Sequence, residues 1–222
     1  DSNIRYSERG QLTLAHTGAT VRSFRQRAEV NKHFGGRTEL IDRQAVGELV
    51  PNLNLDPAGL PILAGLWHLD GATARHDAVA WGYAKGATQR GVELHQLTEV
   101  TGVNIEAGRV TGVQTNRGKV ACGCVVQAVS GLSADVSKMA GFHLPIVAYP
   151  LQALVTQPVK PFLDPHVSSS ALHCYVHQTS RGEIVIGGGS DPYPLYGTRS
   201  TLELKEGLIA SAVEMFPFMS EM

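Results

Sequence analysis

The 222-residue sequence contains little cysteine, almost no net charge and no long apolar run. Its three cysteines are too few and too unevenly spaced for a disulfide framework, so we expect a reducing, cytoplasmic setting. A formal net charge of -1 provides no broad basic surface for nucleic acid or an anionic membrane. No apolar run approaches the ~20 residues that a membrane-spanning helix needs. The composition therefore favours a globular protein that binds neither nucleic acid nor a membrane.

A glycine-rich phosphate loop is also missing. A GxGxxG turn between an opening strand and a helix would hold a dinucleotide pyrophosphate, and the sequence has none. The Gly187–Gly189 run follows a predicted strand, but the prolines of Asp191–Pro194 prevent a helix from beginning there. We interpret this run as a turn or a close-packing feature. Cys122 and Cys124 have no second ligand pair at metal-binding spacing, so we expect ordinary strand cysteines and no metal.

Both ends of the sequence are unusual for a complete protein. Residue 1 is Asp rather than Met, and strand-like alternation begins almost immediately. The sequence stops at Met222, directly after a helical pattern. The first residues also lack the apolar stretch of a signal peptide. We therefore expect the chain to be the central section of a longer protein.

Apolar periodicity predicts a mixed α+β or α/β fold with a largely antiparallel sheet. Asp42 is predicted to cap a short helix that Pro51 ends. The segment 125–129 is predicted to be a buried strand because four of its five residues are apolar. The other predicted helices are 19–34, 76–89, 133–139 and 200–215. The other predicted strands lie in 4–16, 92–95, 98–103, 109–113, 119–121, 145–160 and 168–191, with a hairpin that pairs 174–177 with 183–186.

His76 is the first candidate for chemistry, because it stands at the predicted start of a helix. Unpaired backbone N–H groups create positive potential at such a position, which favours a neutral imidazole that can act as a nucleophile. Such a histidine can attack the 8α-methyl position of a flavin and leave a permanent bond. A helix-capping or simply exposed histidine is the commoner explanation, and spacing alone does not decide between the two.

Several segments spread along the chain carry a resemblance to one known family. They resemble the β subunits of heterotetrameric sarcosine oxidases, which belong to the D-amino-acid-oxidase-like flavoproteins. The segment around His76 is the most specific part of this similarity. The matching segments are Ser7–Thr17, Gly71–Ala84, Glu99–Val103, Met139–Pro145, Pro150–Val155 and Val185–Gly189.

The resemblance implies two flavins, a noncovalent FAD and a covalent FMN. Carried over by position, His76 is the FMN attachment residue and Val100 is the residue whose backbone meets the FAD adenine. Val129, Ser130 and Gly131 match the family's Ala-Ala-Gly turn beside the FAD. Only Gly131 keeps the family residue, which puts the contribution of the other two in doubt. The family's pyrophosphate-binding turn precedes the point corresponding to residue 1, so we expect an incomplete FAD site and an inactive isolated chain.

The resemblance also suggests a substrate contact. His173, Tyr175 and His177 alternate, so we expect them to share one face of a strand. Related enzymes place a tyrosine on such a strand above the flavin to hold the substrate carboxylate, which makes Tyr175 our candidate. A half-buried structural tyrosine is an equally good explanation.

By the same resemblance, we expect part of a substrate domain in 1–70 and 141–222 and part of the FAD-binding unit in 71–140. The implied reaction is oxidation of sarcosine or a related N-methyl amino acid, with hydride passing to FAD and electrons to FMN and oxygen. Expected partners are other subunits of such a complex, the amine substrate and tetrahydrofolate. A dimethylglycine- or proline-type dehydrogenase and a noncatalytic subunit-docking scaffold stay open as alternatives.

Overall fold

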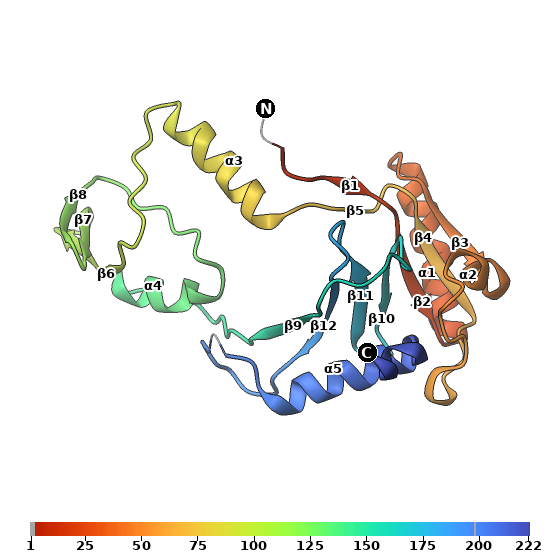
Figure 1. Ribbon diagram of the computed structural model, residues 1–222. Coiled ribbons are helices and arrows are strands. Elements are labelled where there is room, and N and C mark those ends of the chain that lie inside the picture. Colours follow the sequence, from red (N-terminus) through yellow and green to blue (C-terminus); the bar gives the residue numbers. More distant parts are fainter. Residues whose placement is uncertain (1–2, 198) are drawn as a thin grey trace. The chain divides into compact units, whose positions relative to one another are not determined.

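The computed structural model describes residues 3–197 and 199–222, and the chain divides into two units (Figure 1). The domain roles predicted from the sequence stay predictions. Among the described residues, no helix is both long enough and apolar enough to cross a membrane. Unit 1 comprises Asp1–Gly82, Leu151–Ser190 and Arg199–Met222, and unit 2 comprises Tyr83–Pro150 and Asp191–Thr198.

Unit 1 is built on a seven-stranded mixed sheet with the order β3-β4-β2-β10-β11-β12-β9. All neighbouring strands are antiparallel except β2 and β10, which pair in parallel with Leu12 opposite Val167. The prediction of a mixed fold with a largely antiparallel sheet is therefore confirmed. The strands are β2 (Gln11–Ala15), β3 (Thr38–Asp42), β4 (Ala64–His68), β9 (Leu151–Val155), β10 (His166–Ser169), β11 (Cys174–Gln178) and β12 (Ile184–Ser190).

The main core lies on one face of this sheet. Alternate strand residues such as Leu12, Val176 and Ile186 point to it, and all three are buried. Helices α2 (Arg43–Leu49) and α5 (Leu202–Met215) supply the opposing apolar side chains, including Val46 and Leu208. Each buried side chain of this size contributes about 1.5–3 kcal/mol, so this face provides most of the hydrophobic stabilisation of the unit.

The opposite face is covered at one end by α1 (Gly18–His33), which packs Phe24 and Ala28 against β2 and β4. Thr17 begins this helix by accepting a hydrogen bond from the Thr20 backbone N–H at 3.1 Å. Farther along the same face, β2, β10 and β11 expose half-buried polar and aromatic side chains instead of a core. The next subsection builds on these side chains: Thr13, His166, Ser168, Tyr175 and His177.

The sequence predicted one local feature of unit 1 and missed another. Asp42 does cap α2, since its carboxylate accepts a hydrogen bond from the Ala45 N–H at 2.9 Å. By contrast, β3 and β4 were not predicted. In β4 the residues Ala64, Gly65 and Leu66 are all buried, so the sequence lacks the polar–apolar alternation that marks a half-exposed strand.

A two-stranded ribbon leads from the sheet to helix α3 (His76–Thr88). It pairs β1 (Ser7–Glu8) with β5 (Ala72–Thr73) in antiparallel fashion. At its base Gly10 has a φ of +81°, and the Trp67 ring occupies the space that a Cβ at Gly10 would need. Both the backbone conformation and the close approach of Trp67 therefore require glycine at position 10. The short 3-10 helices are η1 (Pro57–Gly59), η2 (Ser130–Leu132) and η3 (Pro217–Glu221).

Unit 2 contains a three-stranded antiparallel sheet and the short helix α4 (Ser133–Met139). Two predicted strands are wrong: neither 92–95 nor 125–129 forms a strand. The second segment is also not buried, because the Val126 side chain is 86% exposed. Among the described residues no strand pairs with either segment, so their backbone N–H and C=O groups form no inter-strand hydrogen bonds. The strands are β6 (Val100–Glu106), β7 (Arg109–Thr115) and β8 (Gly118–Ala121).

Candidate functional site

His76 is the first residue of α3 and is exposed. It follows the β1–β5 ribbon directly, and the Arg75 N–H donates to the Ile4 carbonyl at 3.0 Å, which continues the ribbon to the helix. None of the described residues forms a hydrogen bond with the His76 ring. The predicted position at a helix N-terminus is therefore confirmed, whereas a bond to a flavin stays a prediction.

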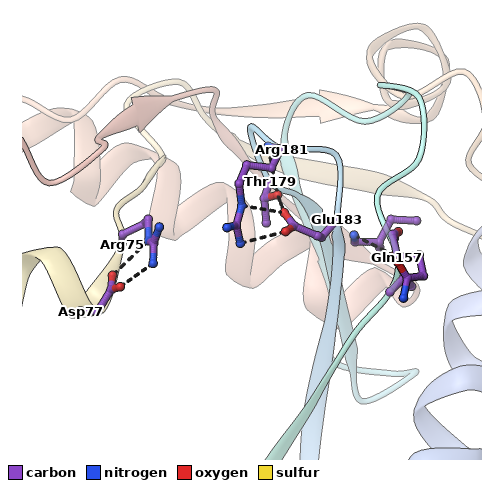
Figure 2. Close-up of polar contacts among 8 residues, drawn as sticks. Arg75, Asp77, Gln157, Thr179, Arg181 and Glu183 are labelled. Atoms are coloured by element: carbon purple, nitrogen blue, oxygen red, sulfur yellow. Dashed lines mark hydrogen bonds and ion pairs between the residues drawn. The ribbon is translucent and has the colours of Figure 1, made fainter.

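The residues on either side of His76 pair with each other (Figure 2). The Arg75 guanidinium forms two contacts with the Asp77 carboxylate, one of them from Nε at 3.0 Å. Hydrogen bonds from Arg75 and from the Ala78 N–H lower the pKa of Asp77. Asp77 is thus an anion in the first turn of α3, where it opposes the positive end of the helix dipole. The pair fixes the side chains beside His76 and leaves the imidazole free.

Three aromatic rings gather on the polar face of the seven-stranded sheet. Tyr175 and His177 alternate along β11, and their rings stack with centroids 6.4 Å apart and an interplanar angle of 19°. His166 on the neighbouring strand β10 places its ring 5.2 Å from Tyr175 and 5.7 Å from His177. The structure thus brings Tyr175 and His177 together as predicted, and adds a histidine that the sequence analysis missed.

His173 does not belong to this cluster, so one expectation about the strand is wrong. It precedes β11 and has a φ of +48°, a left-handed turn conformation that ends the strand alternation. The ring that lies beside Tyr175 and His177 is instead that of His166 on β10. The pattern His166-Val167-Ser168 does alternate, but only the register of β10 against β11 shows which ring it brings to Tyr175.

The two clustered histidines are neutral at physiological pH. Burial, and to a smaller extent the nearby His177, lower the pKa of His166 to about 4. Burial also lowers the pKa of His177. The buried Nδ1 atom of His177 has no hydrogen-bond partner among the described residues. Both rings line a cavity of about 10 Å³, together with Arg9 and Thr73 of the ribbon region. A cavity of this size has room for roughly one water molecule.

The Gly187–Gly189 run belongs to β12 and is not a phosphate loop, as predicted. A Cβ at Gly187 would lie 2.3 Å from the Tyr175 hydroxyl oxygen, so the tyrosine ring rests directly on this glycine. A Cβ at Gly188 would lie 2.2 Å from the His173 carbonyl oxygen. The run is thus a close-packing feature beside the ring cluster.

The predicted FAD contacts lie in unit 2. Val100 is the first residue of β6 and pairs with Thr115. Val129 precedes the 3-10 helix η2, in which Ser130 has a φ of +48° and is followed by Gly131. This tight turn leads directly into α4. Backbone groups at a strand end and a tight turn can approach a nucleotide closely, but a role in binding FAD stays a prediction for all four residues.

The three cysteines are free and differ in their surroundings. Cys122 and Cys124 carry free thiols near the end of β8. Cys174 is buried in the main core, and burial raises the pKa of its thiol to about 12. Among the described residues no three His, Cys, Asp or Glu side chains group to hold a metal ion. Cys174 is therefore an inert core residue.

The polar face combines a phenol hydroxyl, two neutral imidazoles and the nearby Arg9 guanidinium. Such groups can donate hydrogen bonds to a carboxylate, and the histidines bring no buried positive charge. The ribbon that lines the small cavity continues to His76 three residues after Thr73. The polar face of the sheet and the exposed His76 are therefore connected through one short ribbon in unit 1.

Comparison with known proteins places the chain in a family. The family described as DAO, FAD dependent oxidoreductase, matches residues 1–222. The β subunit of sarcosine oxidase from Rhodobacter capsulatus is 41% identical over 220 residues, which are 99% of this chain and 53% of that protein. The corresponding subunit from Rhizobium meliloti is 42% identical over 218 residues, 98% of this chain and 52% of that protein. The chain thus spans about half the length of these relatives.

The fold is also shared with a solved structure. L-proline dehydrogenase from P. horikoshii superimposes with a TM-score of 0.88 and 29% sequence identity. The match covers 97% of this chain and 58% of the dehydrogenase chain. The chain therefore has the fold of a section of this dehydrogenase.

Proposed function

Because the chain belongs to the FAD dependent oxidoreductase family, we propose that it forms part of an enzyme that oxidises sarcosine or a related N-methyl or secondary amino acid. The observation that carries the proposal is the similarity to sarcosine oxidase β subunits over nearly the whole chain. The polar ring cluster on the sheet gives this reaction a plausible substrate face.

Tyr175 is the proposed contact for the substrate carboxylate. Its ring lies on the polar face of the sheet, and its neighbours are neutral imidazoles that can share hydrogen bonds with an anion. A hydrogen bond from a phenol to a charged carboxylate contributes about 1.5–3 kcal/mol, enough to orient a small amino acid. The proposed role of Tyr175 is therefore to bind and orient the substrate.

His76 is the proposed attachment residue for FMN. Its exposed ring has no hydrogen bond to any described residue, so a ring nitrogen is available to hold the isoalloxazine covalently. Val100 and the turn Val129–Gly131 are the proposed contacts for FAD, held noncovalently. When bound, the two flavins would supply the redox chemistry, from hydride acceptance to the transfer of electrons to oxygen.

The proposed assembly includes other subunits, since the relatives are named as one subunit of sarcosine oxidase. The imine product would be hydrolysed, or its one-carbon unit would pass to tetrahydrofolate. The described residues contain no glycine-rich turn that would hold the FAD pyrophosphate, so this chain alone should bind FAD weakly and be inactive.

The attachment at His76 can be tested in a protein that carries the full length of the relatives. After precipitation with trichloroacetic acid, the parent should retain yellow colour in the pellet, and His76→Ala should lose it. His33→Ala removes an exposed histidine of α1 and is the matched control, which should stay yellow. Colour that stays protein-linked in His76→Ala would show that another residue holds the flavin.

A second candidate function is a dehydrogenase for proline or a similar secondary amine, favoured by the structural match to L-proline dehydrogenase. The two reactions differ in their electron acceptor. Sarcosine turnover with oxygen uptake and peroxide formation supports the oxidase. Reduction of an artificial dye by proline without peroxide supports the dehydrogenase.

A further inference from the structure

The position of the Tyr175 ring depends on a glycine in the neighbouring strand. Tyr175 and Gly187 are directly opposite each other in the β11–β12 pair. A Cβ added at Gly187 would lie 2.3 Å from the Tyr175 Oη, 2.4 Å from Cζ and 2.8 Å from Cε1. These separations are far below van der Waals contact, so the outer half of the ring lies flat over the glycine. No side chain at position 187 is compatible with this ring position.

The same ring also lies beside the two histidines. His177 stacks on Tyr175 at a centroid separation of 6.4 Å, and His166 lies 5.2 Å away. The phenol thus contacts the bare backbone of β12 and neighbours two imidazoles. Because aromatic pairs of this kind contribute beyond their buried area, the ring has one preferred position.

The neighbouring glycines, Gly188 and Gly189, are required for a different reason than Gly187. Gly188 and Gly189 have φ values of +136° and +66°, and the pairing of β12 with β9 shifts its register between Gly187 and Ser190. A Cβ at Gly188 would meet the backbone of His173, which cannot give way. At Gly187 the obstacle is the far end of a tyrosine side chain, which can rotate away. A substitution there should move the phenol while the strand stays in place.

We propose that Gly187 is a positioning residue, which determines where the Tyr175 hydroxyl meets the substrate carboxylate. The proposal rests on the proposed function of Tyr175. It assigns to the first glycine of β12 a role in substrate affinity, although this glycine offers no side chain to the substrate. The glycine acts through the tyrosine by leaving space for its ring.

The test compares steady-state kinetics of variants in a flavin-loaded protein that carries the full length of the relatives, with sarcosine as substrate. Tyr175→Phe should raise KM roughly 10- to 100-fold and leave kcat largely unchanged, because it removes one hydrogen bond to a bound carboxylate. Gly187→Ala should raise KM by a similar factor, since the displaced hydroxyl no longer reaches the carboxylate. Gly207→Ala is the matched control: nothing lies within 4 Å of a Cβ at Gly207 in α5, and KM should not change.

A double variant separates positioning from general damage. Once Tyr175→Ala has removed the ring, Gly187→Ala has nothing to displace and should raise KM no further. A further rise in the double variant would overturn the proposal, because the glycine would then act independently of the tyrosine. An unchanged KM in Gly187→Ala would also overturn it, while Tyr175→Phe still supported the substrate contact. An unchanged KM in Tyr175→Phe would remove the proposed role of Tyr175, and this inference with it.

Discussion

Gln178 is a single buried side chain that holds together the loop in front of β10 and the β11–β12 turn. Its amide oxygen accepts hydrogen bonds from the Phe162 and Leu163 N–H groups at 2.9 and 3.3 Å. Its amide nitrogen donates to three backbone carbonyls, among them that of Gly182 at 3.1 Å. One side chain thus forms hydrogen bonds with five backbone N–H and C=O groups that lie outside the helices and strands.

Replacing this amide should be costly. We expect Gln178→Leu to lower the free energy of unfolding by about 2–5 kcal/mol, because it leaves buried backbone donors and acceptors without hydrogen-bond partners. Urea unfolding of the chain measures this change. Gln44→Leu is the control: Gln44 is exposed on α2, so its loss should cost no more than about 0.5 kcal/mol. Equal effects at the two positions would contradict the assigned role.

The two neutral histidines predict a dependence of stability on pH. The pKa of His166 is about 4 in the folded chain, below its ordinary value of 6.5. Between these values the unfolded chain binds a proton that the folded chain does not, so stability falls as pH falls from 6.5 to about 4. The slope for one histidine is at most about 1.4 kcal/mol per pH unit.

Unfolding curves recorded between pH 8 and pH 4.5 test this expectation. His166→Phe keeps a ring in the cluster but cannot be protonated, so its stability should fall less steeply below pH 6.5 than that of the parent chain. A variant with the same slope as the parent would show that other groups cause the loss. His177 contributes to the same window because its pKa is also lowered.

The ring cluster also shows how far the sequence predicts a site. Tyr175 and His177 could be grouped because alternation along one strand is a local property. His166 could not be added, since its position depends on which strand pairs with β11 and in which register. The contact between Tyr175 and Gly187 depends on the same kind of long-range pairing. Residues within one element are thus predictable, and contacts between elements are not.

At the scale of the secondary-structure element, the sequence correctly predicts where α2 begins. We expect Asp42→Ala to destabilise the chain by about 0.5–2 kcal/mol, because α2 loses the side chain that caps it. Asp42→Asn keeps a capping oxygen and should recover most of this loss. The midpoint of urea unfolding reports both. An Asn variant as unstable as the Ala variant would show that the charge of Asp42, not the cap, matters.

Apolar runs predict strands less well than caps predict helices. Segment 125–129 has the composition of a buried strand, yet no described strand pairs with it. In contrast, β4 is a true central strand whose sequence contains Ala and Gly instead of alternating side chains. A strand forms only when a neighbouring strand supplies hydrogen bonds to its backbone N–H and C=O groups. The composition of a segment does not show whether such a neighbour exists.

The two units of the chain should differ in local stability. Among the described residues of unit 2, Ala134 is the only apolar side chain that is buried, whereas unit 1 contains the large core on α5 and the sheet. Hydrogen exchange measured by mass spectrometry should therefore be roughly tenfold or more faster in β7 than in β11. Equal protection of the two strands would show that unit 2 has a stabilising source other than side-chain burial.

The parallel pairing of β2 with β10 has a consequence for biosynthesis. Thr13 and Ser168 meet across this pair although 155 positions separate them in the chain. At 5–20 residues per second, a ribosome needs roughly 8–30 seconds to deliver the second strand after the first. During that interval the β2 side of the nascent β3–β4–β2 sheet is an unprotected edge, which is where self-association should begin. Nascent chains stalled before His166 should therefore scatter more light than the completed polypeptide.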